Sequence, residues 1–498
     1  MWASLETVVR LTPAAHFMEF TLPLSLAVIG SLLADCLAHP RRSGLRQEAG
    51  LWLTALSSMV AFGLFLALSG DTLLAALTAL ALQVLLVVSS NAKLRILGEP
   101  LHFSDLALFF AVFQHPQFYF SALSIWQKIV GLAVLASLIA AFVWRFDTSV
   151  AIHLGGATIA VIGIMAIALS LRLPAFRKLA ARPDAEGDVA KLGLVPTLLL
   201  YWLRWRGTPP QTLRSAEPHA ATVANEAEIV IAIQCESFAD PVELFGDRKY
   251  ALPALESARL QAAQWGNLLV SGFGAYTMRT EYGVLFGREE EALGFCRYDP
   301  FLTAAREAEW ALPHRLGTGA WRSLFVHPHD MRFYNRHAIM PAAGFAELVS
   351  EDAFAPPLPG EGRYVTDKAV ADKILQLAQA AEERRFIYAV TIENHGPWSV
   401  DGALEDDSLL NQYLRRVQAS DAMLGQLLDG LAALRRPAVL AFFGDHRPSI
   451  PGLSQPGGPR HTPYVILKLD RNGDLVPGTN AREDITPAQL HRAILGMV

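Results

Sequence analysis

The chain has 498 residues, of which 52% are hydrophobic and only 18% are charged, and its formal net charge is −5. This length exceeds one compact core, so at least two domains are expected, and the negative charge gives no support for a nucleic-acid partner. Its three cysteines, Cys36, Cys235 and Cys296, exclude a disulfide scaffold, although a bond between Cys235 and Cys296 stays open in an oxidising compartment.

The hydrophobic residues are concentrated before about residue 172, where several windows approach the roughly 20 residues that a helix needs to cross a bilayer. Transmembrane helices are predicted for residues 20–37, 51–68, 72–88, 125–143 and 150–169. A weaker window, residues 103–120, is interrupted by Asp105, His115 and Pro116 and is either a sixth span or a re-entrant segment. No cleavable signal peptide is evident, because the first window lacks a basic segment before it and more spans follow.

Basic residues predict the orientation of these spans. They lie after the first span, after the third span and between the last two: Arg41, Arg42, Arg46, Lys93, Arg95 and Arg145. By the positive-inside rule, all three loops face the cytoplasm. Six spans satisfy this rule and place the C-terminal part of the chain outside. Five spans put one basic loop on the wrong side or the C-terminal part inside, so charge favours six.

Residues 173–227 connect the membrane windows to the rest of the chain. Within them, residues 192–206 mix Leu, Tyr and Trp with basic residues. Such a segment is either an amphipathic helix on the lipid surface or an ordinary helix that packs against a domain. Residues 207–227 include Pro209 and Pro210, which is typical of a linker. The sequence therefore predicts a transmembrane domain at 1–172, an interfacial helix and linker at 173–227, and a further domain at 228–498.

In the domain at 228–498, short apolar runs alternate with longer helical segments. Strands are predicted at residues 228–234, 322–326, 386–392, 438–443 and 464–469, and helices at residues 366–383 and 409–434. This alternation predicts an α/β domain with a mostly parallel sheet between helices. Ligands of such sheets bind beyond the carboxyl ends of the strands, so polar residues directly after these strands are candidates for a site.

Three such residues follow predicted strands. Glu236 and Asp445 come two residues after their strands, and His395 comes three residues after its strand. Each alone has an ordinary explanation as a helix cap, a turn or a core histidine. Since the carboxyl ends of parallel strands share one edge of the sheet, we expect the clusters to converge there.

The clusters contain the ligands of a divalent ion. Glu236, Asp445 and His446 offer two carboxylates and an imidazole, which suit Mn²⁺, Mg²⁺ or Zn²⁺. A hydroxyl bound to such an ion loses its proton more readily and becomes a nucleophile. Thr277 is the candidate, and attack on a phosphate ester would leave a covalent phospho-threonine. Taken alone, the residues leave neighbouring hydroxyls open as alternatives: Ser237, Ser271 and Thr280.

The order of these motifs resembles the lipoteichoic acid synthase family. It more closely resembles the Gram-negative relatives that transfer phosphoglycerol to periplasmic glucans, within the alkaline phosphatase and sulfatase superfamily. The resemblance runs from about residue 93 to about residue 467. Its motifs are residues 91–105, 236–240, 277–287, 327–336, 393–397 and 443–446.

The resemblance implies roles for individual residues. The ion would be bound by Glu236, Thr277, Asp445 and His446, with Thr277 as the nucleophile. The phosphoglycerol pocket would be lined by His327, Tyr334, Arg336 and His395, with His461 as a further candidate. The Arg336 fork would hold two phosphate oxygens, and His395 would also act in catalysis by protonating the leaving group. In the loop before the nucleophile, Tyr276 stands where relatives usually carry small glycines, and Tyr334 stands where many carry Trp.

The predicted function is transfer of phosphoglycerol from phosphatidylglycerol to a hydroxyl of an envelope glycan through phospho-Thr277. The protein would be a multi-pass protein of the bacterial inner membrane with its catalytic domain in the periplasm. One divalent ion is expected, with Mn²⁺ first and Mg²⁺ or Zn²⁺ as alternatives. Other functions left open are a phosphoethanolamine transferase, a sulfatase-like phosphodiesterase and a non-catalytic envelope scaffold. Residues 277–279 (Thr-Met-Arg) lack the Cys or Ser of a sulfatase formylglycine motif.

Overall fold

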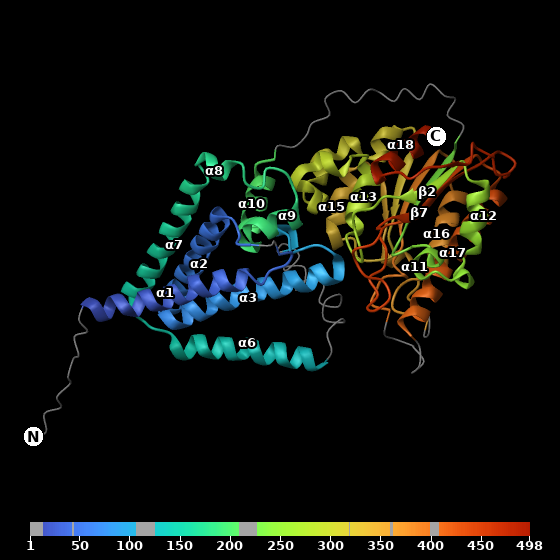
Figure 1. Ribbon diagram of the computed structural model, residues 1–498. Helices are drawn as coiled ribbons and strands as arrows, with labels where there is room; N and C mark the ends of the chain where they lie inside the picture. The colour runs from blue at the N-terminus through green and yellow to red at the C-terminus, as the bar shows by residue number, and fades with distance from the viewer. Residues whose placement is uncertain are drawn as a thin grey trace, which may run out of the picture. The chain divides into compact units, whose positions relative to one another are not determined.

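The computed structural model describes residues 13–41, 44–105, 125–208, 227–317, 319–358, 362–398 and 408–498 (Figure 1). The chain divides into two compact units, which we name unit one and unit two. Unit one comprises residues 1–95 and 99–207, and unit two comprises residues 96–98 and 208–498. Residues 106–120 and 209–226 lie outside the described residues, so the sixth span and most of the linker stay predictions.

The five stronger membrane windows all lie on helices. These are α1 (Pro13–Asp35), α2 (Glu48–Ser69), α3 (Thr72–Leu97), α6 (Ile125–Arg145) and α7 (Val150–Ser170). Helices α2, α3 and α7 are long and apolar enough to cross a membrane, with mean hydropathies of 2.0, 2.3 and 2.2. Helices α1 and α6 carry shorter apolar stretches, Phe20–Asp35 and Gly131–Arg145.

Two glycines let α2 and α7 approach each other closely. A Cβ atom on Gly63 would lie 2.5 Å from the backbone nitrogen of Ala160, and one on Gly156 would lie 2.4 Å from that of Ala67. No side chain fits at these separations. Small residues at a helix crossing are a common way for apolar helices to associate in lipid.

The segment predicted as an interfacial helix packs within unit one. Residues 194–206 of it form α10 (Leu194–Arg206), which follows the short helices α8 (Pro174–Arg177) and α9 (Ala185–Leu192). Leu194, Leu198 and Tyr201 are buried. The buried Asp35 carboxylate accepts a hydrogen bond from the Leu194 backbone at 3.0 Å and pairs with Arg46 at 2.9 Å. The carboxylate thus complements the N-terminal end of α10, and these contacts support the alternative of a domain-packing helix.

Unit two contains an eight-stranded sheet in the order β4-β3-β5-β1-β6-β7-β2-β8. The strands are β1 (Ile229–Cys235), β2 (Gln264–Leu268), β3 (Arg322–Val326), β4 (Glu347–Val349), β5 (Arg385–Val390), β6 (Ala438–Gly444), β7 (Thr462–Leu469) and β8 (Ala481–Arg482). Strands β4, β3, β5, β1 and β6 run parallel, whereas β7 is antiparallel to β6 and to β2. The predicted mostly parallel sheet is confirmed; β2, β4 and β8 were not predicted.

Helices cover both faces of this sheet (Figure 1). One face packs against α13 (Thr277–Phe286), α15 (Arg336–Ala342) and α18 (Pro487–Met497), and the other against α12 (Pro253–Gln261), α16 (Asp367–Gln379) and α17 (Leu409–Leu434). Alternate residues of β1 point to opposite faces, since Val230 and Ala232 belong to the first core and Ile231 and Ile233 to the second.

Short helices complete unit two. They are α11 (Pro241–Phe245), α14 (Leu312–Leu316) and the 3₁₀ helices η1 (Arg248–Tyr250), η2 (Glu290–Tyr298), η3 (Pro300–Leu302), η4 (Ala304–Trp310), η5 (Phe333–Asn335) and η6 (Glu351–Ala353). Cys36, Cys235 and Cys296 are unbonded, so the disulfide left open by the sequence is not formed in this structure. The parallel neighbours β3, β5, β1 and β6 end at one edge of the sheet, and the polar clusters follow there.

Candidate active site

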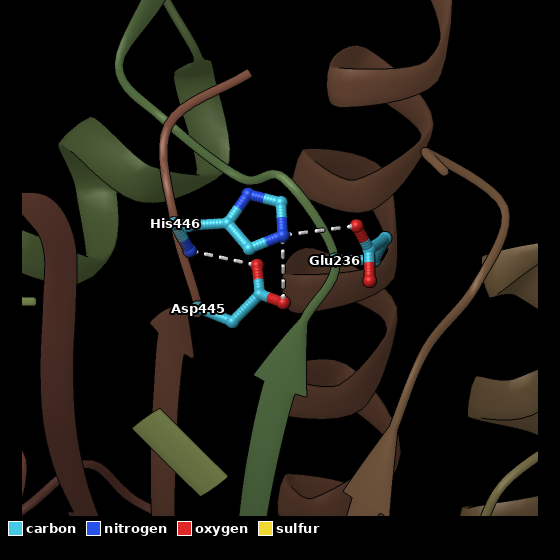
Figure 2. A group of neighbouring side chains, drawn as sticks. All are labelled: Glu236, Asp445 and His446. Carbon is cyan, nitrogen blue, oxygen red and sulfur yellow. Dashed lines mark hydrogen bonds and ion pairs between the residues drawn. The ribbon is translucent and has the colours of Figure 1, made fainter. Parts of the chain in front are cut away.

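Three ligand-type side chains lie together beyond β1 and β6. Glu236 follows β1, and Asp445 and His446 follow β6. Their ligand atoms all lie within 4.8 Å of one another, and all three residues are buried. His446 Nε2 is 3.5 Å from Glu236 Oε1 and 3.5 Å from Asp445 Oδ2 (Figure 2). We name these residues the ligand group.

Hydrogen bonds fix the orientation of the ligand group. Asp445 Oδ1 accepts from the backbone N–H groups of Ser237 and His446, both at 2.8 Å. Ser237 Oγ donates to Glu236 Oε1 at 2.9 Å. His446 Nδ1 lies 3.2 Å from the carbonyl oxygen of Arg447, so Nδ1 holds the proton and the Nε2 lone pair faces the carboxylates.

The charges of the ligand group fit a cation. Burial and the nearby Glu236 carboxylate raise the pKa of Asp445 to about 7. Asp445 Oδ2 is buried and accepts no hydrogen bond from the part of the chain that the structure describes. Donors that share an ion at about 2.1 Å lie about 3.0–3.4 Å apart. The observed separations of 3.5 Å are close to this range, so these oxygen and nitrogen donors suit one divalent ion.

Thr277 brings a hydroxyl to the ligand group. Its Oγ1 lies 3.5 Å from His446 Nε2, and Thr277 is the first residue of α13. The turn into α13 is made by Tyr276, whose φ of 77° is in the left-handed region. The Tyr276 ring packs against Arg279, with the guanidinium carbon 3.9 Å from the ring centre, and this packing accommodates its bulk. The positive end of the α13 dipole therefore lies at the candidate nucleophile.

The backbone around Thr277 is supported by Gln234 and Tyr388, which the sequence analysis did not single out, and by Thr280. Gln234 Nε2 donates to the Thr277 carbonyl oxygen at 3.3 Å, and the Tyr388 hydroxyl donates to Gln234 Oε1 at 2.7 Å. Thr280 Oγ1 donates to the Asp445 carbonyl oxygen at 2.7 Å, which joins α13 to the end of β6. Gln234 had a visible signal, because an amide in the apolar, fully buried run IVIAIQC requires a partner.

Arg336 is engaged in a buried ion pair. Its Nε and Nη2 donate to Glu281 Oε1 and Oε2 at 3.1 and 2.6 Å, and its Nη1 donates to His327 Nε2 at 3.1 Å. The guanidinium fork that was expected to hold two phosphate oxygens is therefore bonded to Glu281. A bidentate grip on phosphate would require breaking these bonds, so the predicted role of Arg336 stays untested in that form.

His327 is neutral beside this pair. Its Nδ1 donates to the Val390 carbonyl oxygen at 2.9 Å. Burial and the Arg336 charge hold its pKa well below the usual value of a histidine. His327 therefore presents no positive charge of its own to a substrate.

The other predicted pocket residues each have partners of their own. The Tyr334 ring centre is 5.2 Å from the Arg336 guanidinium carbon, so these two residues lie together. His395 follows β5, and its Nδ1 donates to the Gly396 carbonyl oxygen at 2.7 Å. His461 Nε2 lies 2.6 Å from Glu243 Oε1. His461 thus contacts Glu243 and also Arg447, whose Nη2 lies 2.8 Å from His461 Nε2 and which directly follows His446 in the chain.

The chain is similar in sequence to a known family and to individual proteins of it. The sulfatase family matches residues 228–497. The chain is 31% identical over 430 residues to the capsular polysaccharide biosynthesis protein RkpI of Rhizobium meliloti (strain 1021), covering 82% of this chain and 79% of that protein. It is 28% identical over 233 residues to a second protein of that organism, provisionally named a cyclic beta-1,2-glucan modification protein, covering 44% of this chain and 36% of that protein.

Solved structures similar to this chain cover about half of it. The Streptococcus pyogenes phosphoglycerol transferase GacH, in complex with sn-glycerol-1-phosphate, is 19% identical with a TM-score of 0.43 over 54% of this chain and 74% of that chain. The lipoteichoic acid synthase LtaP from Listeria monocytogenes is 17% identical with a TM-score of 0.44 over 54% of this chain and 71% of that chain. From the family match and the relationship to RkpI, we conclude that the chain belongs to the sulfatase family.

Proposed function

We propose that this protein transfers phosphoglycerol from phosphatidylglycerol to a hydroxyl of an envelope glycan. The observation that carries the proposal is the 3.5 Å separation of Thr277 Oγ1 and His446 Nε2, which brings a hydroxyl to the ligand group. Membership of the sulfatase family supports phosphotransferase or hydrolase chemistry. The motif resemblance favours phosphoglycerol as the transferred group, and a relative named for capsular polysaccharide biosynthesis favours a glycan acceptor.

One divalent ion would be held by the ligand group together with Thr277. Mn²⁺ is the expected ion, and Mg²⁺ and Zn²⁺ are alternatives. When bound, such an ion acidifies a coordinated hydroxyl and neutralises charge on a phosphate oxygen. The protein prepares for this by aligning Asp445 through the Ser237 backbone at 2.8 Å and by directing the His446 Nε2 lone pair inward.

The chain's own residues would then carry out two steps. In the first, Thr277 Oγ gives its proton to water and bonds to phosphorus while the bond from phosphorus to the diacylglycerol oxygen breaks. His395 would supply a proton to that leaving oxygen. The N-terminal end of α13 favours the negative charge that builds on the phosphoryl group. In the second step, the acceptor oxygen bonds to phosphorus and gives its proton to His395, which lost one in the first step. The bond from phosphorus to Thr277 Oγ breaks, and Thr277 Oγ takes a proton from water.

The apolar helices suit a donor that is itself a membrane lipid. Helices α2, α3 and α7 are each long enough to cross a bilayer. We assign the transmembrane domain to residues 1–172, the packing helix and linker to residues 173–227, and the catalytic domain to residues 228–498. The basic loops support a catalytic domain outside the cytoplasm, which corresponds to the periplasmic side of a bacterial inner membrane.

The test is release of diacylglycerol by the purified full-length protein. Vesicles containing phosphatidylglycerol or phosphatidylethanolamine would be supplied with Mn²⁺, with and without a periplasmic glucan as acceptor. We expect phosphatidylglycerol to be cleaved, the glucan to gain phosphoglycerol by mass spectrometry, and Thr277→Ala to abolish both. Cleavage of phosphatidylethanolamine alone would replace the proposal by a phosphoethanolamine transferase.

A matched control separates chemistry from folding. Thr303→Ala removes the hydroxyl of a half-buried threonine, which donates to the Pro300 carbonyl oxygen at 3.3 Å, and should retain wild-type turnover. Thr277→Ser should keep measurable activity because it keeps a hydroxyl. If Thr277→Ala were fully active and had the melting temperature of the wild type, Thr277 would not be the nucleophile.

A further inference from the structure

A basic segment follows the last membrane-length helix of unit one. Helix α7 ends at Ser170, and the chain continues through the short helix α8 at the end of α7 (Figure 1). We name residues 172–182 the basic segment, because all of their charged side chains are cations: Arg172, Arg177, Lys178 and Arg182. All four side chains are exposed, and none of them forms an ion pair within the described part of the chain.

Helix α10 holds the basic segment in place. Arg204 Nη2 donates to the carbonyl oxygens of Arg177 and Leu179 at 2.5 and 3.1 Å. The last turn of α10 therefore lies beside the basic segment, at the same end of unit one. This turn carries a further exposed pair, because the Arg206 guanidinium carbon lies 5.0 Å from the ring centre of Trp202, which is 40% exposed.

Apolar surface continues from α7 into the basic segment. Met165 and Leu169 of α7 are both 57% exposed, and Leu173 in the segment is 54% exposed. Cationic side chains at the end of such a helix reach the lipid headgroups with their charges, while their hydrocarbon stems stay on the apolar surface. Trp202 with Arg206 is a similar combination, because tryptophan is enriched where a membrane meets water. This end of unit one therefore has the composition of a surface in the headgroup layer.

Neither the orientation of the spans nor acidic partners account for these cations. Under the proposed topology α7 ends outside the cytoplasm, whereas the positive-inside rule concentrates Lys and Arg on the cytoplasmic side. The carboxylates nearest in sequence are on or beside α9. Of these, Asp188 accepts a hydrogen bond from the Tyr201 hydroxyl at 2.7 Å, and Asp184 lies 4.0 Å from Lys191. The third, Glu186, forms no ion pair with the residues that the structure describes, so the basic segment keeps its positive charge.

We propose that the basic segment, with Trp202 and Arg206, binds the headgroups of anionic phospholipids in the outer leaflet and enriches phosphatidylglycerol beside this protein. The inference goes beyond the transfer reaction, and only the choice of leaflet rests on the proposed function. Guanidinium groups bind the phosphate oxygens of any phospholipid. The ammonium of phosphatidylethanolamine cancels the charge of its phosphate, whereas phosphatidylglycerol keeps a net negative charge. The exposed cations therefore attract phosphatidylglycerol in preference to zwitterionic lipids.

The test measures lipid association with the full-length protein in bilayers that contain a chelator, so that no metal-dependent turnover occurs. Spin-labelled phosphatidylglycerol and phosphatidylcholine are compared by electron paramagnetic resonance, which separates lipid held at the protein surface from bulk lipid. We expect phosphatidylglycerol to associate about two- to fivefold more strongly than phosphatidylcholine. The preference should fall when salt is raised to about 1 M, where the Debye length is about 3 Å.

Variants assign the preference to the basic segment. Arg177→Gln combined with Lys178→Gln should remove most of it, whereas Arg177→Lys, which keeps the charge, should retain it. Arg306→Gln combined with Arg471→Gln is the matched control and should leave the preference unchanged. It also removes two exposed cations, which belong to unit two and form no ion pair with other described residues.

The outcomes separate this inference from the proposed function. Equal association of both lipids with the wild type would overturn the inference, and so would an equal loss of preference in the control. Cleavage of phosphatidylglycerol by a wild type without any lipid preference would leave the proposed function standing. A lipid preference without cleavage would leave the lipid surface standing and remove the transfer reaction. If the Arg177 and Lys178 double variant melts early, Arg172→Gln combined with Arg182→Gln decides the outcome.

Discussion

Replacing Glu281 by Gln should destabilise unit two strongly. The Glu281 and Arg336 side chains are 0% and 2% exposed, and hydrogen bonds of 2.6 and 3.1 Å join them. Glu281→Gln leaves the Arg336 guanidinium charged and buried without a counter-ion, which costs about 3–5 kcal/mol. For a unit of this size, each kcal/mol lowers the melting temperature by about 2–4 °C, so a decrease of about 6–20 °C is expected.

The assay is thermal unfolding of the full-length protein in detergent, followed by tryptophan fluorescence at one fixed scan rate. Glu281→Met combined with Arg336→Met should recover most of the loss, because it removes both charges and fills similar volume. Glu347→Gln is the control: Glu347 pairs with Arg322 at side-chain exposures of 42% and 48%, and its loss should cost less than about 1 kcal/mol. A Glu281→Gln melting temperature no lower than that of Glu347→Gln would refute the reasoning.

Three further predictions concern the site. The pKa of Asp445 is raised from 3.8 to about 7 in the folded protein. Between these two pH values, the metal-free folded protein therefore binds one proton more than the unfolded chain does. In the presence of a chelator, the melting temperature of the wild type should therefore fall as the pH rises from about 4 to about 7. The Asp445→Asn variant should not show this fall. An identical pH profile in both proteins would contradict the prediction. At pH 8, Mn²⁺ at a hundredfold excess over its Kd should stabilise the wild type by about 2.7 kcal/mol and raise its melting temperature accordingly. The melting temperature of Asp445→Asn should not rise. Equal shifts in both proteins would exclude binding at this carboxylate. Gln234→Leu should lower kcat about tenfold with little change in KM, because it releases the Thr277 carbonyl that Gln234 holds at 3.3 Å, whereas an unchanged kcat would make the contact purely structural.

The sequence predicted the parts of the site that depend on local pattern. Apolar runs mark the ends of β1, β5 and β6, and so Glu236, His395 and Asp445 could be placed at one edge before any coordinates were known. The predicted convergence of Glu236 and Asp445 is observed, with each 3.5 Å from the same imidazole nitrogen. Their roles as ligands remain predictions.

What escaped the sequence depends on pairing between distant segments. Arg336 and Glu281 are 55 residues apart, and no local pattern in the sequence shows that the Glu281 carboxylate accepts hydrogen bonds from the Arg336 guanidinium. Strand β2 (QWGNL) was missed because it is only partly buried and contains glycine and asparagine. Tyr364 was not singled out from the sequence, because its ring neighbours His329 and His395 are distant from it along the chain.

The alternation of β1 has a consequence for how this protein can evolve. Gln234 points to the face covered by α13, where it supports Thr277, and its neighbours Ile233 and Cys235 belong to the opposite core. Inserting or deleting a single residue in this strand would move its following side chains to the opposite face of the sheet. The Gln234 amide would then lie among apolar side chains, and Glu236 would leave the ligand group. The same seven positions, Ile229–Cys235, thus determine both the packing of the two hydrophobic cores and the placement of the site residues. Insertions and deletions should therefore be tolerated only in the connecting loops.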